Sequence, residues 1–238
     1  MRIAAIDAST LVAGVALRED DTLVYESSLR AGLTHSQTLM PMVESAFAMA
    51  GWTPGEVDIY AAVAGPGSFT GLRIGVSTVK GMAQAVGAKT VAVGTLEVLA
   101  MGVPCFSGLC VPLLDARREQ VYTAAYAWEG DGLREVFPPA AMALQEWIGI
   151  LDGQAGPILL CGDGMAAYGP QVREALGERV RLAPPHAVMQ RPAACAVLAR
   201  KKVLAGEARM PGELVPFYVR GSSALTIAQR KQGANGGV

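Results

Sequence analysis

The sequence predicts an α/β protein made of two lobes, and three observations lead to this prediction. Short apolar runs typical of buried strands alternate along the chain with longer segments of helical periodicity. The second half opens as the first does: an apolar strand ends in an acid, Asp7 or Asp115, and a second strand follows a short polar turn. The length of 238 residues exceeds one average domain and suits one or two compact lobes.

The first half predicts a sheet covered by helices. Five apolar runs are expected to form strands, at residues 3–7, 12–17, 22–28, 58–64 and 89–93. Three segments are expected to form helices, at residues 36–50, 72–86 and 95–101. Gly51 stands where a glycine commonly ends a helix, and Pro41 inside the first helix removes one backbone hydrogen bond.

The second half repeats this pattern with few identical residues, which we interpret as a duplicated lobe. Strands are expected at 111–115, 121–127 and 157–161, helices after the 162–164 loop and at 192–205, and a helix, a strand and a connection within 172–188. From Gly221 onward the chain is rich in Gly, Ser and Gln, which predicts a disordered tail. The expected division is 1–104, 105–220 and a tail of 221–238.

Composition and charge exclude several classes of protein. Hydrophobic residues make up 51% of the chain, enough for a buried core, and the formal net charge is −1. A protein that grips nucleic acid alone needs clustered Lys and Arg, so this balance argues against that class. We expect no signal peptide, because the apolar run that ends at Asp7 is short and no small-residue cleavage site follows it. We expect no membrane span, because the most apolar region, 91–114, is interrupted by Glu97, Pro104 and Pro112. The four cysteines form no CxxC pair, which predicts reduced, buried thiols and a cytoplasmic protein.

The helix expected at 72–86 is unusual because Gly75 and Gly81 lie inside it. Each costs roughly 1 kcal/mol relative to alanine, so close approach of another backbone is expected to offset the cost. Its apolar positions cover more of the circumference than one sheet face requires, which favours a second packing partner. The helix expected at 36–50 also has a core stripe, while Met40 and Met49 point elsewhere, and methionine is common on surfaces that meet a partner. The alternative, that both helices only fill a core, remains open.

A glycine-rich loop before a helix also raises the hypothesis of nucleotide binding. The candidate residues are Asp7, Ser9 and Thr10 between two strands and Gly67 in the loop. The loop matches neither GxxxxGK[ST] nor GxGxxG. The structural alternative is an acid that accepts hydrogen bonds from its own turn. With only two histidines in the chain, no histidine pair at helical spacing is available for a metal.

Residues 65–75, Gly-Pro-Gly-Ser-Phe-Thr-Gly-Leu-Arg-Ile-Gly, closely resemble the TsaB family, formerly called YeaZ. The resemblance is strong over the first half, sparser from 136 to 210 and absent in the tail. Further stretches that resemble the family occur in the family's order: Ile6-Asp7-Ala8-Ser9-Thr10, His35-Ser36-Gln37, Thr95-Leu96-Glu97, Asp115-Ala116-Arg117-Arg118 with Val121-Tyr122, and Val215-Pro216-Phe217-Tyr218-Val219-Arg220.

The resemblance implies a fold and a role. The fold would be a reduced member of the actin and sugar-kinase (ASKHA) superfamily with two RNase H-like lobes. The role would be that of a non-catalytic partner subunit that binds and activates TsaD, which transfers a threonylcarbamoyl group to N6 of the adenosine beside the anticodon in tRNA. The paired metal-binding histidines of TsaD are missing from this chain.

The resemblance also implies partners: a heterodimer with TsaD, a ternary complex with TsaE, a homodimer when alone, and tRNA only through the complex. It implies no cofactor of the chain's own and leaves open ATP or ADP at the complex interface. Two rivals remain, a small-molecule ATP-dependent phosphotransferase that uses Asp7 and the loop around Gly67, and a self-sufficient homodimeric binding protein. The predicted partner-binding residues are Leu39, Met40, Val43, Phe47, Gly71, Leu72, Gly75, Val76 and Val79.

Overall fold

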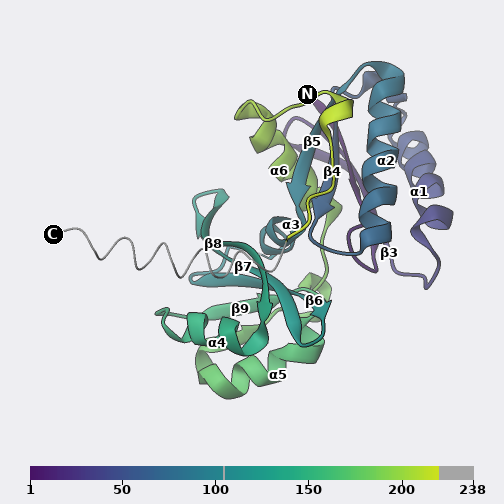
Figure 1. Ribbon diagram of the computed structural model, residues 1–238. Coiled ribbons are helices and arrows are strands. Elements are labelled where there is room, and N and C mark those ends of the chain that lie inside the picture. The colour runs from purple at the N-terminus through teal and green to yellow at the C-terminus, as the bar shows by residue number, and fades with distance from the viewer. Residues whose placement is uncertain (104, 220–238) are drawn as a thin grey trace. The chain divides into compact units, whose positions relative to one another are not determined.

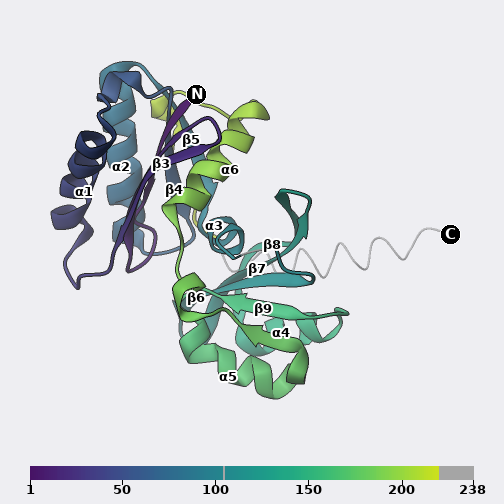
Figure 2. The same ribbon diagram turned by 180° about the vertical axis from the view of Figure 1, so that it is seen from behind.

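The computed structural model describes residues 1–103 and 105–219, which form two compact units. The first unit consists of residues 1–102 together with 189–217, and the second consists of 103–188 with the described residues from Tyr218 onward (Figures 1 and 2). The tail predicted at 221–238 lies outside the described residues.

The first unit contains a five-stranded sheet in the order β3-β2-β1-β4-β5. Strands β1, β4 and β5 run parallel, while β2 is antiparallel to β1 and β3 antiparallel to β2. The carboxyl ends of the three parallel strands therefore meet at one edge of the sheet. The bounds are β1 Arg2–Asp7, β2 Ala13–Glu19, β3 Thr22–Leu29, β4 Ile59–Gly65 and β5 Lys89–Gly94.

Helices cover both faces of this sheet. Helices α1 (His35–Ala50) and α2 (Phe69–Val86) lie side by side on one face, and α6 (Pro192–Leu204) and the shorter α3 (Thr95–Met101) pack on the other (Figures 1 and 2). Because side chains alternate along a strand, Ile6 of β1 faces the first pair of helices. Sheet and helices thus enclose two cores, one on each face.

Two caps set the ends of α2. Ser68 Oγ accepts a hydrogen bond from Gly71 N (3.2 Å), and Gly87 ends the helix with φ +73°. The helix therefore begins at Phe69, three residues before the predicted start. Helix α1 ends at Gly51 in the left-handed conformation, as its sequence predicted.

The second unit repeats the topology of the first. Its sheet has the order β10-β9-β6-β7-β8, which is the first sheet's order when strands are matched along the chain. The duplication predicted from the shared pattern is therefore present as a fold. The bounds are β6 Leu109–Arg117, β7 Gln120–Glu129, β8 Gly132–Ala143, α4 Leu144–Asp152, β9 Ile158–Cys161, α5 Met165–Leu176 and β10 Val180–Leu182, and the 3₁₀ turns are Pro54–Glu56, Gly177–Arg179, Pro185–Ala187 and Pro211–Glu213.

The division between units differs from the expected boundary at 104. Residues 189–217, assigned by sequence to the second lobe, return to the first unit. The reason is that α6 supplies the second face of the first sheet: Cys195, Ala196 and Ala199 are fully buried in the core beside β1. The returning segment thus completes a lobe whose sheet and other α-helices lie before residue 103.

The structure also describes the surroundings of the cysteines and the lengths of the helices. Three cysteines, Cys110, Cys161 and Cys195, are buried as predicted, whereas Cys105 is exposed. Within residues 1–103 and 105–219, no helix combines the length and the apolar character that crossing a bilayer requires.

Candidate functional site

The outward faces of α1 and α2 form the surface that the sequence singled out, and we call these exposed residues the helix-pair face. Met40 and Met49 of α1 are 42% and 78% exposed, as predicted, and Phe69 at the start of α2 is 55% exposed. The Arg73 guanidinium stacks on the Phe69 ring at 3.9 Å. The exposed residues are Ser36, Gln37, Met40, Pro41, Glu44, Ser45, Ala48, Met49, Phe69, Thr70, Arg73, Ser77, Gly81, Gln84, Ala85 and Val86.

This face carries little charge. Glu44 is the one acid or base among its α1 residues, and Arg73 the one among its α2 residues. Lys80 of α2 is half-buried and donates to the Gly212 carbonyl oxygen. Charged residues are depleted and methionine is enriched in protein interfaces, so the composition of this face suits contact with another protein.

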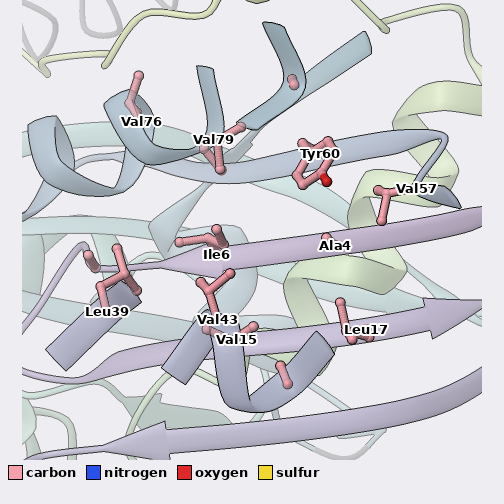
Figure 3. Packing of buried hydrophobic residues seen from close by; sticks show 14 of the residues in the cluster. Ala4, Ile6, Val15, Leu17, Leu39, Val43, Val57, Tyr60, Val76 and Val79 are labelled. Atoms are coloured by element: carbon pink, nitrogen blue, oxygen red, sulfur yellow. The ribbon is translucent and has the colours of Figure 1, made fainter. Parts of the chain in front are cut away.

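The apolar residues predicted to bind a partner face inward instead. Leu39 and Val43 of α1 and Val76 and Val79 of α2 belong to the buried cluster that includes Ile6 of β1. Figure 3 shows Val43 next to Ile6 in this cluster. Phe47 lies in the same core and Leu72 is fully buried, so Met40 alone of the predicted large side chains is exposed. In this fold the buried stripe and the helix-pair face are opposite sides of the same two helices.

Two of the glycines predicted at the partner surface are also directed inward. A Cβ at Gly71 would collide with the carbonyl oxygen of Ala8, in the turn between β1 and β2. A Cβ at Gly75 would lie 3.4 Å from Ala8 Cβ, which is ordinary contact. The close backbone approach expected from these glycines is therefore made by the unit's own turn.

Gly81 is different. It lies in the interior of α2, it is exposed, and a Cβ there would meet no atom within 4 Å. A helix-interior glycine costs roughly 1 kcal/mol relative to alanine, and nothing in the described unit offsets that cost. Together with the neighbouring Ser77 and Ala85, it leaves a shallow strip where a second backbone can approach α2 closely.

The residues proposed to bind nucleotide come together, but their polar groups bond to one another. Asp7 Oδ1 accepts hydrogen bonds from Ser9 N (2.8 Å) and Ser9 Oγ (2.7 Å). Ser9 O accepts from Ser68 N (2.7 Å), and a Cβ at Gly67 would collide with the same oxygen. Asp7, Ser9 and Thr10 are 1%, 0% and 6% exposed, so the turn is packed against the glycine loop. This geometry favours the structural reading of Asp7.

Thr10 connects this turn to two distant segments. His35 is the first residue of α1, and its Nε2 atom lies 2.7 Å from Thr10 O. Gln190 Nε2 donates to Thr10 Oγ1, from the segment that precedes α6. Burial raises the pKa of Asp7 to about 6, against the lowering effects of Ser9, His35 and Gln190. Sequence analysis missed Gln190, since its separation of 180 residues from Thr10 leaves no local signal.

The glycine loop has a second neighbour that the sequence did not reveal. Phe217 N donates to Ala64 O (2.8 Å), and a Cβ at Gly65 would collide with Phe217 O. The loop is thus held between the β1–β2 turn and the returning segment near Phe217. Its glycines are explained by these two close approaches of backbone.

Three comparisons bear on identity. The family described as "TsaD: tRNA N6-adenosine threonylcarbamoyltransferase" matches residues 29–220. Proteins named tRNA threonylcarbamoyladenosine biosynthesis protein TsaB are 33% identical in Bacillus subtilis (92% of this chain, 94% of the relative) and 30% identical in Escherichia coli (94% and 96%). The structure of YeaZ from Pseudomonas aeruginosa superimposes with a TM-score of 0.75 at 25% identity, covering 92% of this chain and 99% of that one.

Two units with the same strand order define the class: an α/β protein built from a duplicated five-stranded lobe. Full-length similarity to the named relatives then gives the particular family. The chain belongs to the TsaB (YeaZ) family.

Proposed function

We propose that the chain acts in the synthesis of threonylcarbamoyladenosine on tRNA as a non-catalytic subunit that docks onto TsaD through the helix-pair face. The observation that carries the proposal is Gly81, a helix-interior glycine on an exposed, nearly uncharged face, where an added Cβ would meet no atom within 4 Å. Family membership supports the pathway, since relatives over most of the chain carry its name.

Docking on this face explains the exposed side chains that the fold itself does not use. Met40 and Met49 adapt their shape to a partner at low cost, and the small residues Ser77, Gly81 and Ala85 admit a partner helix. The buried stripe, including Leu39 and Val76, holds the two helices on the sheet and so fixes the face they present. Docking would stabilise TsaD in its active geometry and provide a platform for TsaE, with tRNA and any ATP or ADP bound by the complex.

The same face suits a second copy of this chain when TsaD is absent. In a two-fold dimer one patch meets itself, so α1 and α2 would pack against α1 and α2 of the other copy. Homodimer and heterodimer would then compete for one surface.

The test replaces Gly81 with arginine and measures binding to TsaD of the same organism by light-scattering size-exclusion chromatography and calorimetry. A long charged side chain at the centre of the strip is expected to weaken binding by at least 100-fold while the monomer stays folded, since no atom lies near that position.

Gly149→Arg is the matched control. Gly149 is likewise an exposed glycine inside a helix, α4 of the second unit, and an added Cβ there meets no atom within 4 Å. This variant should bind TsaD as the unmodified chain does. Undiminished TsaD binding by Gly81→Arg would remove the helix-pair face as the docking site.

A further inference from the structure

Residues 211–217, which we call the strap, lie next to α2 in the first unit (Figure 1). Near one end of the strap, Lys80 Nζ donates a hydrogen bond to Gly212 O over 3.3 Å. At the other end, Phe217 O lies so close to Gly65 that a Cβ on this glycine would collide with it. Gly65 belongs to the loop that leads into α2, so the strap runs from the second half of this helix back towards its start.

Val215 is the exposed apolar residue in the middle of the strap. Its neighbour Leu214 is 4% exposed and is buried in the core beneath α2, whereas Val215 is 60% exposed. Successive side chains of an extended chain point to opposite sides, which accounts for this contrast. Since Val215 lies between Gly212 and Phe217, its outward side chain is presented beside α2.

The side of α2 next to the strap carries Phe69 and Arg73. Phe69, Arg73 and Lys80 are four and seven residues apart, so they lie in one line along the helix, and Lys80 contacts the strap. Phe69 is 55% exposed, and the Arg73 guanidinium stacks on its ring at 3.9 Å. The strap therefore extends the helix-pair face on the side of α2 opposite α1, as Figure 1 shows.

The charges of this surface indicate the chemistry that it would contact. Within residues 1–103 and 105–219, Arg73 forms no ion pair, and its guanidinium lies on the Phe69 ring. The acid of the strap, Glu213, is used locally, since its Oε2 accepts a hydrogen bond from Met210 N over 3.0 Å. An exposed cation next to apolar side chains fits a partner that presents an apolar side chain beside a carboxylate.

We propose that the strap is a third element of the docking face, in addition to α1 and α2. TsaD places an apolar side chain against Phe69 and Val215 and a carboxylate on Arg73. The inference rests on the proposed function, because it adds contacts to the same site. Aromatic residues and arginine are enriched in interfaces, and arginine is frequent among the residues that dominate binding energy, so Phe69 and Arg73 suit this role.

Val215→Asp tests the apolar contact by calorimetry with TsaD of the same organism. The substitution would bury an unpaired carboxylate in the interface, and binding should weaken by about 10- to 100-fold. Leu204→Asp is the matched control, since Leu204 is an apolar residue 69% exposed at the end of α6, which packs on the other face of the sheet. This control should bind as the unmodified chain does, and equal affinities of the two variants would overturn the strap contact.

Hydrogen exchange of the unmodified chain tests the same contact without any substitution. Peptides that cover 212–215 should exchange more slowly in the complex with TsaD than in the free chain, because docking would shield the strap. Unchanged exchange of these peptides in the complex would overturn the strap contact, even if Val215→Asp failed to fold.

Arg73→Gln tests the carboxylate. At low salt this variant should bind TsaD about tenfold more weakly, and its affinity should change less than that of the unmodified chain when salt is raised from about 0.05 M to 0.5 M. Arg30→Gln, at an exposed arginine between β3 and α1, should keep the affinity and salt dependence of the unmodified chain. Equal salt dependence of the two variants would overturn the carboxylate contact.

The strap and the docking face can fail separately. Undiminished TsaD binding by Gly81→Arg would refute the docking face and this extension with it. Weakened binding by Gly81→Arg together with full binding by Val215→Asp would overturn the strap contact alone. The strap contact would be overturned as well if Val215→Asp impaired only the self-association of this chain, because the occupant would then be a second copy.

Discussion

Replacing Gly71 with alanine is the most direct test of how α2 is seated. The new Cβ would collide with the Ala8 carbonyl oxygen and lie 3.1 Å from His35 Cδ2 and 3.3 Å from the Ala8 carbonyl carbon. The main obstacle is backbone, so the turn or the helix must move. Overpacking of this kind costs about 1–3 kcal/mol.

The movement has a second cost. It stretches the hydrogen bond from Ser68 N to Ser9 O, which is 2.7 Å long and contributes about 1 kcal/mol. Alanine has a better helix propensity than glycine, which offsets less than about 1 kcal/mol of this loss at the first turn of the helix. We therefore expect the free energy of unfolding to fall by about 2–3 kcal/mol, which lowers Tm by roughly 4–12 °C for a chain of this size.

Hydrogen exchange in increasing urea, read by mass spectrometry on peptides of β1 and β4, measures this loss in the first unit separately from the second. Gly81→Ala is the control, since its Cβ meets nothing and should raise stability by up to about 1 kcal/mol. Equal stability of Gly71→Ala and the unmodified chain would refute the seating of α2 on the turn.

Two further predictions follow from burial and capping. Under native conditions a thiol reagent should rapidly modify one cysteine of four, Cys105, because the other thiols are buried and their pKa values are raised by desolvation. The variant Cys105→Ser should lose this rapid reaction. Rapid modification of a second cysteine would contradict the prediction. In a thermal melt, Glu26→Gln should lower the free energy of unfolding by about 1–2 kcal/mol, since Glu26 accepts hydrogen bonds from Arg191 Nε (3.1 Å) and from Ala193 N (3.0 Å) at the start of α6. Glu44 is exposed, so Glu44→Gln should have little effect in the same measurement.

The sequence predicted most elements of the fold because their periodicity is local. Helix 95–101 and the closing helix were predicted to within one residue of their observed bounds. The repeated pattern of a strand that ends in an acid, at Asp7 and Asp115, corresponds to two sheets with the same strand order. Strand β8 was missed. It is an edge strand that contains Pro138 and Pro139, and prolines interrupt the strand pattern while an edge tolerates them. Helix α4 was missed as well, because nine residues give a weak periodic signal.

The candidate site was predicted less well, for a physical reason. Periodicity identifies the apolar side of a helix but not what lies against it, so the predicted contacts Val43 and Val76 proved to be the core stripe. The exposed positions of Met40 and Met49 were predicted, since they fall off that stripe. The hydrogen bond from Gln190 to Thr10 could not be predicted from the sequence, because the two residues are 180 positions apart.

The three glycines of α2 divide the helix by function. Gly71 at its first turn is fixed by Ala8, and Gly75 one turn later still touches that turn. Gly81 lies beyond them, and a Cβ added there would meet no atom within 4 Å. One helix therefore has an internal seat at its first turns and, on the proposal above, the docking strip near its other end, and a rigid helix transmits a tilt at one end along its whole length. On the proposed docking mode, a change in the turn beneath Gly71 that tilts α2 would also move the strip around Gly81.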